Sequence, residues 1–232
     1  MNAAIVTVGD ELLVGDTENT NATWLCRRLS DRGVRVRRVT VVPDEVGEIA
    51  RVVNEYHAEY DATVVTGGLG PTHDDVTMDA IAAAFGRAVE ANEEAAAWLA
   101  ERGYSADDLT AETTHLPAGC RPLRNVEGVA PGAVVESTYV LPGVPAEMKA
   151  MFESVADEFE GTPTHTVAVN VAEPESTLLD RFTELQERFE VGVGSYPGEH
   201  VTVKITAADA AEAERAAAWL RDRSTAPERS EP

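Results

Sequence analysis

The sequence has few cysteines, few lysines and no long hydrophobic run, and each shortage excludes a class of protein. Its 232 residues include two cysteines, Cys26 and Cys120, too few for a disulfide framework or a cysteine-based zinc site. No run of about 18 apolar residues occurs, so no transmembrane helix is expected. The N-terminus meets acidic residues early and has no basic region, which argues against a signal peptide and favours a cytoplasmic location.

The charge of the chain is strongly one-sided. There are 41 acidic residues against 19 basic ones, only Lys149 and Lys204 are lysines, and the formal net charge is −22. Such a chain binds nucleic acid and anionic membranes poorly, so neither is expected as a partner. Because the acidic residues are scattered along the sequence, we interpret them as a halophilic surface adapted to salt. An acidic partner-binding face is the alternative.

Hydrophobic patterning predicts an α/β domain over residues 1–163. Continuous apolar runs are typical of buried parallel strands, and helical spacing of apolar residues follows each of them. The expected strands are 3–8, 34–42, 61–66, 133–136 and 138–141. The expected helices are 21–32, 45–60, 76–85, 93–102, a short one at 107–114 and one that begins near Pro145. Residues 116–132 are expected to form an ordered loop. This alternation indicates a mostly parallel sheet.

A second, smaller domain is expected after Gly161-Thr162-Pro163. Residues 164–223 have a strand, a helix, two strands and a helix, which is typical of a small α+β domain. The corresponding ranges are 165–171, 175–189, 191–196, 201–206 and 209–221. A domain of this size is marginally stable alone and often helps assembly. Together with the oligomeric state of the relatives that the motifs below resemble, this leads us to expect a homo-oligomer, at least a dimer. Residues 224–232 are expected to be a disordered tail.

The strongest local motif is the loop at residues 66–77, between a buried strand and a helix. Its glycines, Gly67, Gly68 and Gly70, permit positive φ angles and a close approach of the backbone to a ligand. A helix N-terminus offers free N–H groups to a phosphate, even in an acidic protein. The motif lacks the third glycine of a dinucleotide-binding fingerprint, since His73 stands there, and it lacks the lysine of a Walker A loop.

Two adjacent aspartates, Asp74 and Asp75, close this loop. In the simpler interpretation one of them N-caps the following helix. In the other, one caps the helix while its neighbour holds Mg²⁺, which favours carboxylate oxygens and bridging phosphates. We interpret His73 as a loop residue, because no second histidine or cysteine stands near it at a ligand-like spacing.

Two further segments carry polar residues toward the same sheet edge. After the first strand, Asp10 and Glu11 are candidate ligands, bases or turn residues. Asn21, like Asn19 before it, is a candidate helix cap or ligand contact. At 141–148 two prolines lead into a helix, and Glu147 suits the positive end of that helix.

Four segments together resemble the N-terminal part of the CinA (competence/damage-inducible protein A) family. They read GDELLVGDTENTN, TGGLGPTHDDVT, N-VEGVAPG and LPGVPAEM, and they occur in this order with plausible spacing. That part of CinA belongs to the molybdopterin-binding superfamily of MoaB, MogA and MoeA. The segment from His165, with Gly-Ser-Tyr-Pro at 194–197, resembles the module after the CinA core. The resemblance implies a three-layer, mostly parallel α/β fold followed by a small α+β domain.

The resemblance also implies a site and a choice of functions. Catalytic acids would be Asp74, Asp75, Asp10 and Glu11, with Asp74 and Asp75 as ligands for Mg²⁺, Co²⁺ or Mn²⁺. The implied binding residues are Gly67, Gly68, Gly70, Thr72, Thr77, Asn21, Asn125, Gly143, Pro145 and Glu147. ADP-ribose pyrophosphatase activity is known among CinA relatives, whereas the wider superfamily binds molybdopterin and some of its members adenylylate it. A non-catalytic nucleotide-binding or assembly module is the third hypothesis. The chain ends before the nicotinamide-nucleotide deamidase domain of full-length CinA, so we do not expect that activity.

Overall fold

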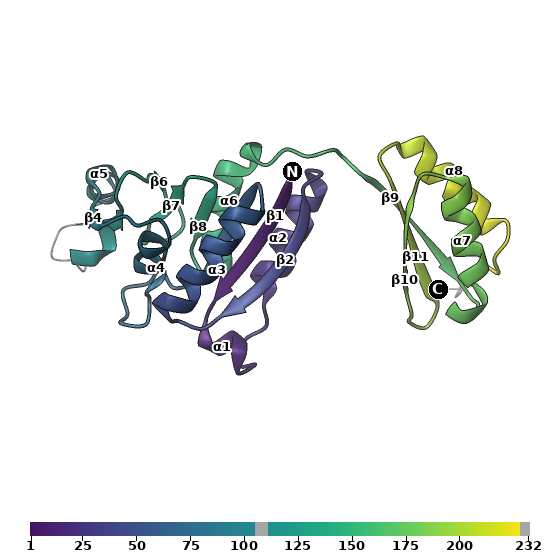
Figure 1. The fold of residues 1–232 in the computed structure, drawn as a ribbon, viewed down its shortest axis with the longest axis horizontal. Coiled ribbons are helices and arrows are strands. Elements are labelled where there is room, and N and C mark those ends of the chain that lie inside the picture. The colour runs from purple at the N-terminus through teal and green to yellow at the C-terminus, as the bar shows by residue number, and fades with distance from the viewer. Residues whose placement is uncertain (105–110, 228–232) are drawn as a thin grey trace. The chain divides into compact units, whose positions relative to one another are not determined.

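The computed structural model describes residues 1–104 and 111–227, and it divides into two compact units, Met1–Gly161 and Thr162–Pro232 (Figure 1). The boundary between the two units, after Gly161, lies two residues before the boundary expected at 163. Among the described residues, none of the helices combines the length and hydropathy that a bilayer crossing requires.

The first unit is built on a six-stranded sheet with the order β2-β1-β3-β8-β7-β6. The first four of these strands are parallel, and β7 and β6 are antiparallel to their neighbours. The strands are β1 (Asn2–Val8), β2 (Arg35–Val42), β3 (Ala62–Thr66), β6 (Arg121–Leu123), β7 (Gly132–Val135) and β8 (Thr138–Leu141). The helices are α1 (Asp10–Leu13), α2 (Thr20–Asp31), α3 (Val46–Glu59), α4 (Thr77–Ala84), α5 (Glu93–Glu101) and α6 (Pro145–Val155).

Helices cover both faces of this sheet and give it three layers. Strand β1 contributes Ile5 to a core with α2 and α6, and it contributes Val6 to a second core with α3 and α4. Both side chains are fully buried, which explains why the strand is a continuous apolar run rather than an alternating one. The predicted three-layer, mostly parallel α/β fold is therefore confirmed.

The ordered loop predicted at 116–132 is wrong in part. Its first residues contribute to β5 (His115–Pro117), which pairs with β4 (Val89–Ala91), and β6 also lies within it. Short strands with proline are hard to recognise, and Pro122 is tolerated because β6 is an edge strand. Of the short helix predicted at 107–114, residues 111–114 form a 3-10 turn, and 105–110 lie outside the described residues.

The second unit is a three-stranded antiparallel sheet, β10-β11-β9, with two helices packed on it. Its elements are β9 (His165–Val171), α7 (Leu179–Arg188), β10 (Gly192–Tyr196), β11 (Val201–Ala207) and α8 (Ala210–Arg221). The helix predicted at 175–189 instead begins as a 3-10 turn, Glu175–Thr177, followed by α7. The sheet buries Val169, Val203 and Ile205 against the helices.

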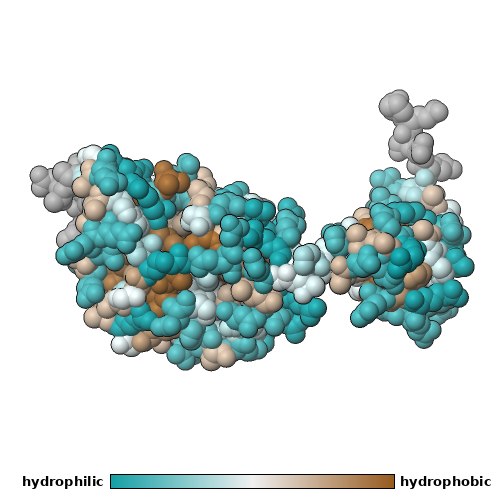
Figure 2. Space-filling model, turned by 90° about the horizontal axis from the view of Figure 1, so that it is seen from above, coloured by the Kyte–Doolittle hydropathy of each residue, from teal (hydrophilic) through white to brown (hydrophobic). Residues whose placement is uncertain are grey.

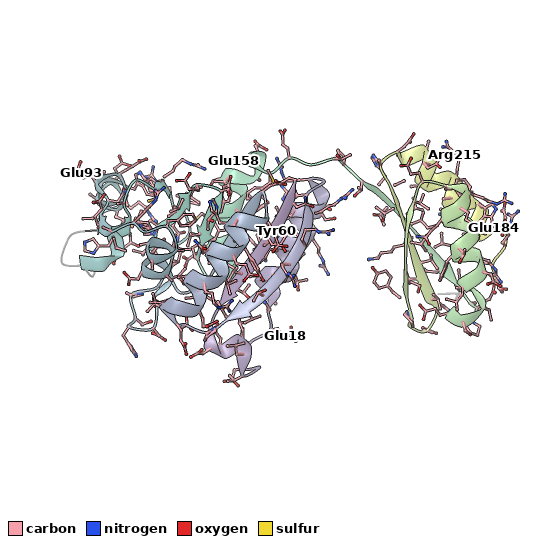
Figure 3. The ribbon with its side chains drawn as sticks, viewed as in Figure 1. Glu18, Tyr60, Glu93, Glu158, Glu184 and Arg215 are labelled. Atoms are coloured by element: carbon pink, nitrogen blue, oxygen red, sulfur yellow. The ribbon has the colours of Figure 1, made fainter. Side chains whose placement is uncertain are left out.

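The acidic residues are spread over many elements of both units. Figure 3 labels Glu18, Glu93, Glu158 and Glu184, which come from different parts of the chain. The face shown in Figure 2 is mostly hydrophilic on both units, and smaller apolar areas lie among the hydrophilic residues of each unit. The charge is therefore not concentrated in one segment.

The start of the expected tail is held by an ion pair in the second unit. Glu173 accepts two hydrogen bonds from Arg181, at 2.6 and 3.0 Å, and one from the Thr225 N–H at 2.6 Å. Arg181 also donates to Ser224 Oγ. The prediction that the chain is disordered from residue 224 onward is thus wrong for Ser224 and Thr225, while residues 228–232 lie outside the described chain.

This cluster makes the stability of the second unit sensitive to acid. The Arg181 hydrogen bonds, followed by that from the Thr225 N–H, lower the pKa of Glu173 from 4.5 to about 2. A lowered pKa means that the stabilisation is complete above pH 4.5 and is lost as the pH falls through about 2. We expect Glu173→Gln to reduce the free energy of unfolding by roughly 1 kcal/mol at pH 7.

Urea unfolding of both proteins between pH 7 and 3 checks this expectation. The difference between them should begin to shrink below pH 4.5. Glu184→Gln, in an exposed pair with Arg188 on α7, serves as the control and should cost less than about 0.5 kcal/mol. A deficit for Glu173→Gln that is constant over the whole pH range would contradict the assignment.

Candidate functional site

Three loops meet where parallel strands β1, β3 and β8 end. The hydroxyl of Thr66, the last residue of β3, donates to the carbonyl of Pro142 at 2.6 Å. Asn21 on α2 donates to the carbonyl of Gly143 at 2.7 Å and lies 3.4 Å from the Thr66 hydroxyl. Asn21 thus links α2 to the loops after β3 and β8, and Asn19, rather than Asn21, caps α2.

The glycines after β3 are required by their surroundings. Gly67 and Gly68 have φ angles of 112° and 65°, as the sequence predicted. A Cβ on Gly67 would lie 2.2 Å from the carbonyl oxygen of Val8, and a Cβ on Gly68 would lie 2.3 Å from Thr77 Oγ1. The glycine backbone at these two positions therefore packs closely against other parts of the protein, namely Val8 and Thr77. Thr77 is fully buried, and its hydroxyl has no hydrogen-bond partner among the described residues.

The two aspartates of the loop have different surroundings. The predicted N-cap is wrong, because α4 begins at Thr77 with Val76 as its N-cap and no side chain caps it. Instead Asp75 accepts hydrogen bonds from the Thr72 N–H, at 3.0 Å, and from the Thr72 hydroxyl, and so closes the loop. Asp74 is exposed, and its carboxylate lies 3.9 Å from His73.

A cavity of about 960 Å³ opens beside the glycine loop. It is lined by part of the loop, by α4 and by the segments before β7 and after β8. Six of the predicted site residues line it: Gly68, Gly70, Thr72, Asp75, Gly143 and Glu147. The other eight, Asp10, Glu11, Asn21, Gly67, Asp74, Thr77, Asn125 and Pro145, do not.

The charged groups of this cavity are acidic. Asp75, Asp79 and Glu147 line it, and no lysine or arginine of the described chain does. An anionic ligand would therefore be held by backbone N–H groups, by the imidazole of His115, which also lines the cavity, or by a cation bound together with it. Asp79 was not among the predicted residues, although its position four residues after Asp75 on a predicted helix offered a signal.

Glu147 is held at the cavity wall by Asn125. The Asn125 amide nitrogen donates to Glu147 Oε2 at 2.7 Å and to the Ala130 carbonyl at 2.9 Å. Its amide oxygen accepts from the N–H groups of Glu127 and Gly128. Asn125 is only 4% exposed and does not line the cavity, so it holds Glu147 without itself facing a ligand.

Asp10, Glu11 and Asp74 surround a carboxylate that the sequence did not single out, Asp44. Asp44 follows β2, and its Oδ2 accepts the Asp10 N–H at 2.9 Å. Burial raises the pKa of Asp44, the Asp10 N–H opposes this, and the three neighbouring carboxylates raise the pKa further. Its Oδ1 lies 3.5 Å from the position of a Cβ on Gly68, on the side of the loop where Thr77 also lies.

Asp44→Asn is expected to stabilise the first unit slightly. A raised pKa means that stability falls as the pH rises above 3.8, and the cost remains at neutral pH. The asparagine keeps an acceptor for the Asp10 N–H and removes the repulsion, so the free energy of unfolding should rise by roughly 0.5 kcal/mol at pH 7. Denaturant unfolding at pH 7, with the exposed Asp16→Asn as control, measures this. A loss of stability in Asp44→Asn would contradict the account.

The carboxylates fit a divalent cation only if a ligand contributes oxygens. Within residues 1–104 and 111–227, no three His, Cys, Asp or Glu side chains are arranged to hold a metal ion. Mg²⁺ usually keeps one or two carboxylates and completes its shell with water and substrate phosphates. Asp75 and Asp79 are the carboxylates that α4 and the glycine loop present to the cavity, whereas Asp74, which was predicted as a ligand together with Asp75, does not line it.

The first unit matches a known family along nearly all of its length. The family model described as a probable molybdopterin binding domain matches residues 4–160. The crystal structure of the protein CinA from Thermoplasma acidophilum, described as a protein with unknown function, is 37% identical. It covers 68% of this chain and 97% of its own, with a TM-score of 0.64.

Relatives that span both units are found in archaea. Protein TK1472 of Thermococcus kodakarensis is 39% identical over 244 residues, which cover 96% of this chain and 97% of the relative. Protein PH0439 of Pyrococcus horikoshii is 39% identical over 228 residues, which cover 89% of each. The chain therefore belongs to the family of probable molybdopterin-binding domains, and its first unit is CinA-like.

Proposed function

We propose that the cavity beside the glycine loop binds a ligand with two linked phosphates and hydrolyses the bond between them, as in ADP-ribose. The observation that carries this proposal is the composition of the cavity, in which the glycine loop, whose backbone carries N–H groups, and three carboxylates occur together without lysine or arginine. The N–H groups suit phosphate oxygens. The carboxylates suit a divalent cation that bridges to the phosphates.

The size of the cavity favours a dinucleotide over a single nucleotide. At about 960 Å³ it lies at the upper end of the roughly 300–1,000 Å³ typical of small-molecule sites. Glycine-loop residues, Gly68 to Thr72, line one part of it, and Gly128 to Pro131 line another. A ligand that extends from the loop thus has room for a second nucleoside or sugar.

The chemistry assigned to the residues is limited to phosphoryl transfer to water. Water adds to one phosphorus, the bond from that phosphorus to the bridging oxygen breaks, and AMP and ribose phosphate leave. Loop N–H groups would stabilise the charge on the leaving phosphate, and Asp79 would accept a proton from the water. A divalent cation such as Mg²⁺, Co²⁺ or Mn²⁺ would neutralise phosphate charge when bound. Asp75 would orient this cation and hold the glycine loop in place.

Product-resolved turnover tests this proposal. ADP-ribose is incubated with the protein and Mg²⁺, Co²⁺ or Mn²⁺, both in dilute buffer and in molar KCl, and products are identified by mass. AMP and ribose phosphate are expected in equal amounts, and chelation of the metal should stop their release. Absence of AMP under every condition would reject the hydrolase.

A second candidate function is binding or adenylylation of molybdopterin. It is favoured by the family match over residues 4–160, whose description names molybdopterin binding. The same loop would then hold the phosphate of the pterin. Fluorescence of a pterin retained on the purified protein, without AMP release from ADP-ribose, would place this candidate first.

A further inference from the structure

Glu147 is an acidic side chain of the cavity that is held in place by a buried residue, and neither the loop geometry nor the reaction above uses it. Asn125 fixes one of its carboxylate oxygens, at 2.7 Å. Gly128 packs directly on the carboxylate, since a Cβ on Gly128 would lie 2.2 Å from Glu147 Cδ. No ion pair joins Glu147 to a basic side chain within the described residues. A carboxylate held in this way, at a cavity wall and without a cation, is a prepared hydrogen-bond acceptor.

The segment that holds Glu147 is itself braced. Arg102 donates to the backbone carbonyls of Asn125, at 2.7 Å, and of Gly128. The Asn125 amide oxygen accepts two backbone N–H groups, so its nitrogen must face Glu147. The orientation of this amide is therefore determined by the loop, and it places a donor rather than an acceptor against the carboxylate.

Glu147 also lies close to where the phosphates are proposed to bind. It is in the first turn of α6, and the segment before this helix contacts the glycine loop, since a Cβ on Gly143 would lie 3.3 Å from the Cα of Gly67. Glu147 and the loop residues Gly68 to Thr72 line the same cavity, so a group attached to a phosphate on the loop would extend along the cavity wall that includes Glu147. In a nucleotide that group is a ribose, whose neighbouring hydroxyls are neutral donors suited to a fixed carboxylate.

From these contacts we infer that Glu147, positioned by Asn125, binds the 2′- and 3′-hydroxyls of a ribose whose phosphate lies on the glycine loop. This rests on the proposed binding of a phosphate-bearing nucleotide, and it names Glu147 as a specificity-determining residue and Asn125 as a positioning residue. An acidic residue on ribose hydroxyls is an established way for proteins to recognise nucleotides. A carboxylate that reads the amino and N–H edge of a guanine or pterin ring is the competing arrangement.

The test compares dissociation constants of ADP and 2′,3′-dideoxy-ADP, measured by calorimetry with Mg²⁺ on the full chain. The wild type should bind ADP at least roughly tenfold more tightly, as expected for a hydrogen bond to a charged group. Glu147→Gln should reduce this preference to within about threefold and leave binding of the dideoxy nucleotide nearly unchanged. Glu127→Gln, the same change on an exposed side chain of the same loop, should leave the preference intact.

Asn125→Asp tests the positioning role. It keeps the oxygen that accepts the loop N–H groups and replaces the donor to Glu147 by a second carboxylate. The preference for ADP should fall. Because the new carboxylate is buried against Glu147 and the Ala130 carbonyl, the midpoint of thermal unfolding should fall too, so binding is measured at a temperature at which circular dichroism shows the variant folded. Loss of preference without loss of fold separates positioning of Glu147 from support of the loop.

Each remaining outcome is decisive. Equal binding of both nucleotides by the wild type would overturn the ribose assignment and leave the phosphate site standing. A preference for ADP that survives in Glu147→Gln would overturn it as well. A preference for GDP over ADP that is lost in Glu147→Gln would show that the carboxylate reads a base edge instead. Failure of the wild type to bind either nucleotide would reject this inference together with the proposed function.

Discussion

Replacing Asp75 with alanine is expected to lower kcat/KM for ADP-ribose cleavage by at least roughly 100-fold. Asp75 both closes the glycine loop through Thr72 and presents a carboxylate to the cavity. The alanine removes both contributions. Asp75→Asn separates them, because its amide oxygen can still accept from Thr72 while the charge is lost. If the charge matters, the asparagine variant should retain the fold and lose most of the activity.

Asp74→Ala is the matched control for this prediction. Asp74 is the neighbouring aspartate, it is exposed, and it does not line the cavity. Its replacement should change kcat/KM by less than about tenfold. Equal losses in both alanine variants, or unchanged turnover in Asp75→Ala, would contradict the assignment of Asp75.

Gly68→Ala is expected to have the largest effect on stability. At a φ of 65° an alanine costs about 1–2 kcal/mol, and its Cβ would lie 2.3 Å from the buried Thr77 Oγ1. Relief of that overlap costs a further 1–3 kcal/mol or so by displacement of α4 or of the loop. Because the loop is also the proposed phosphate site, binding of ADP should weaken by at least roughly tenfold.

Two variants separate backbone strain from the overlap with Thr77. Gly86 has a φ of 62° and no atom within 4 Å of the position of a Cβ. Gly86→Ala should therefore cost only about 1–2 kcal/mol and leave ADP binding unchanged. In Gly68→Ala with Thr77→Ala the 2.3 Å overlap with Oγ1 is removed and only the 3.3 Å contact with Cβ of residue 77 remains, so part of the stability should return. Urea unfolding gives these free energies, and an equal cost for Gly68→Ala and Gly86→Ala would contradict the steric argument.

The central layer of the fold could be predicted because its strands are continuous apolar runs. Strand β1 is buried on both faces, and a run of this kind has few alternatives to a parallel sheet. The strands at the other end of the sheet could not be predicted in the same way. β6 has three residues, Arg121–Leu123, and its stability comes from pairing with β7, which local sequence does not reveal.

The candidate site was predictable as a set of loops but not as a set of contacts. Because parallel strands end at one edge, the loops after β1 and β3 could be placed together. The different surroundings of Asp74 and Asp75 arise from a single turn closed by Thr72, which their adjacency in the sequence conceals. Asp44 was missed because a proline and an aspartate after a strand are typical of an ordinary turn. Its hydrogen bond from the Asp10 N–H comes from α1, a distant part of the chain.

The central claim is that a phosphate-bearing ligand lies on the glycine loop. A crystal structure of the protein with ADP-ribose and Mn²⁺, in which anomalous scattering locates the metal, tests it most directly. The account predicts phosphate density against the backbone N–H groups of Gly68, Leu69 and Gly70, with the metal between the phosphates and Asp75. A ligand bound elsewhere, or a cavity without ligand density at saturating concentration, would contradict it.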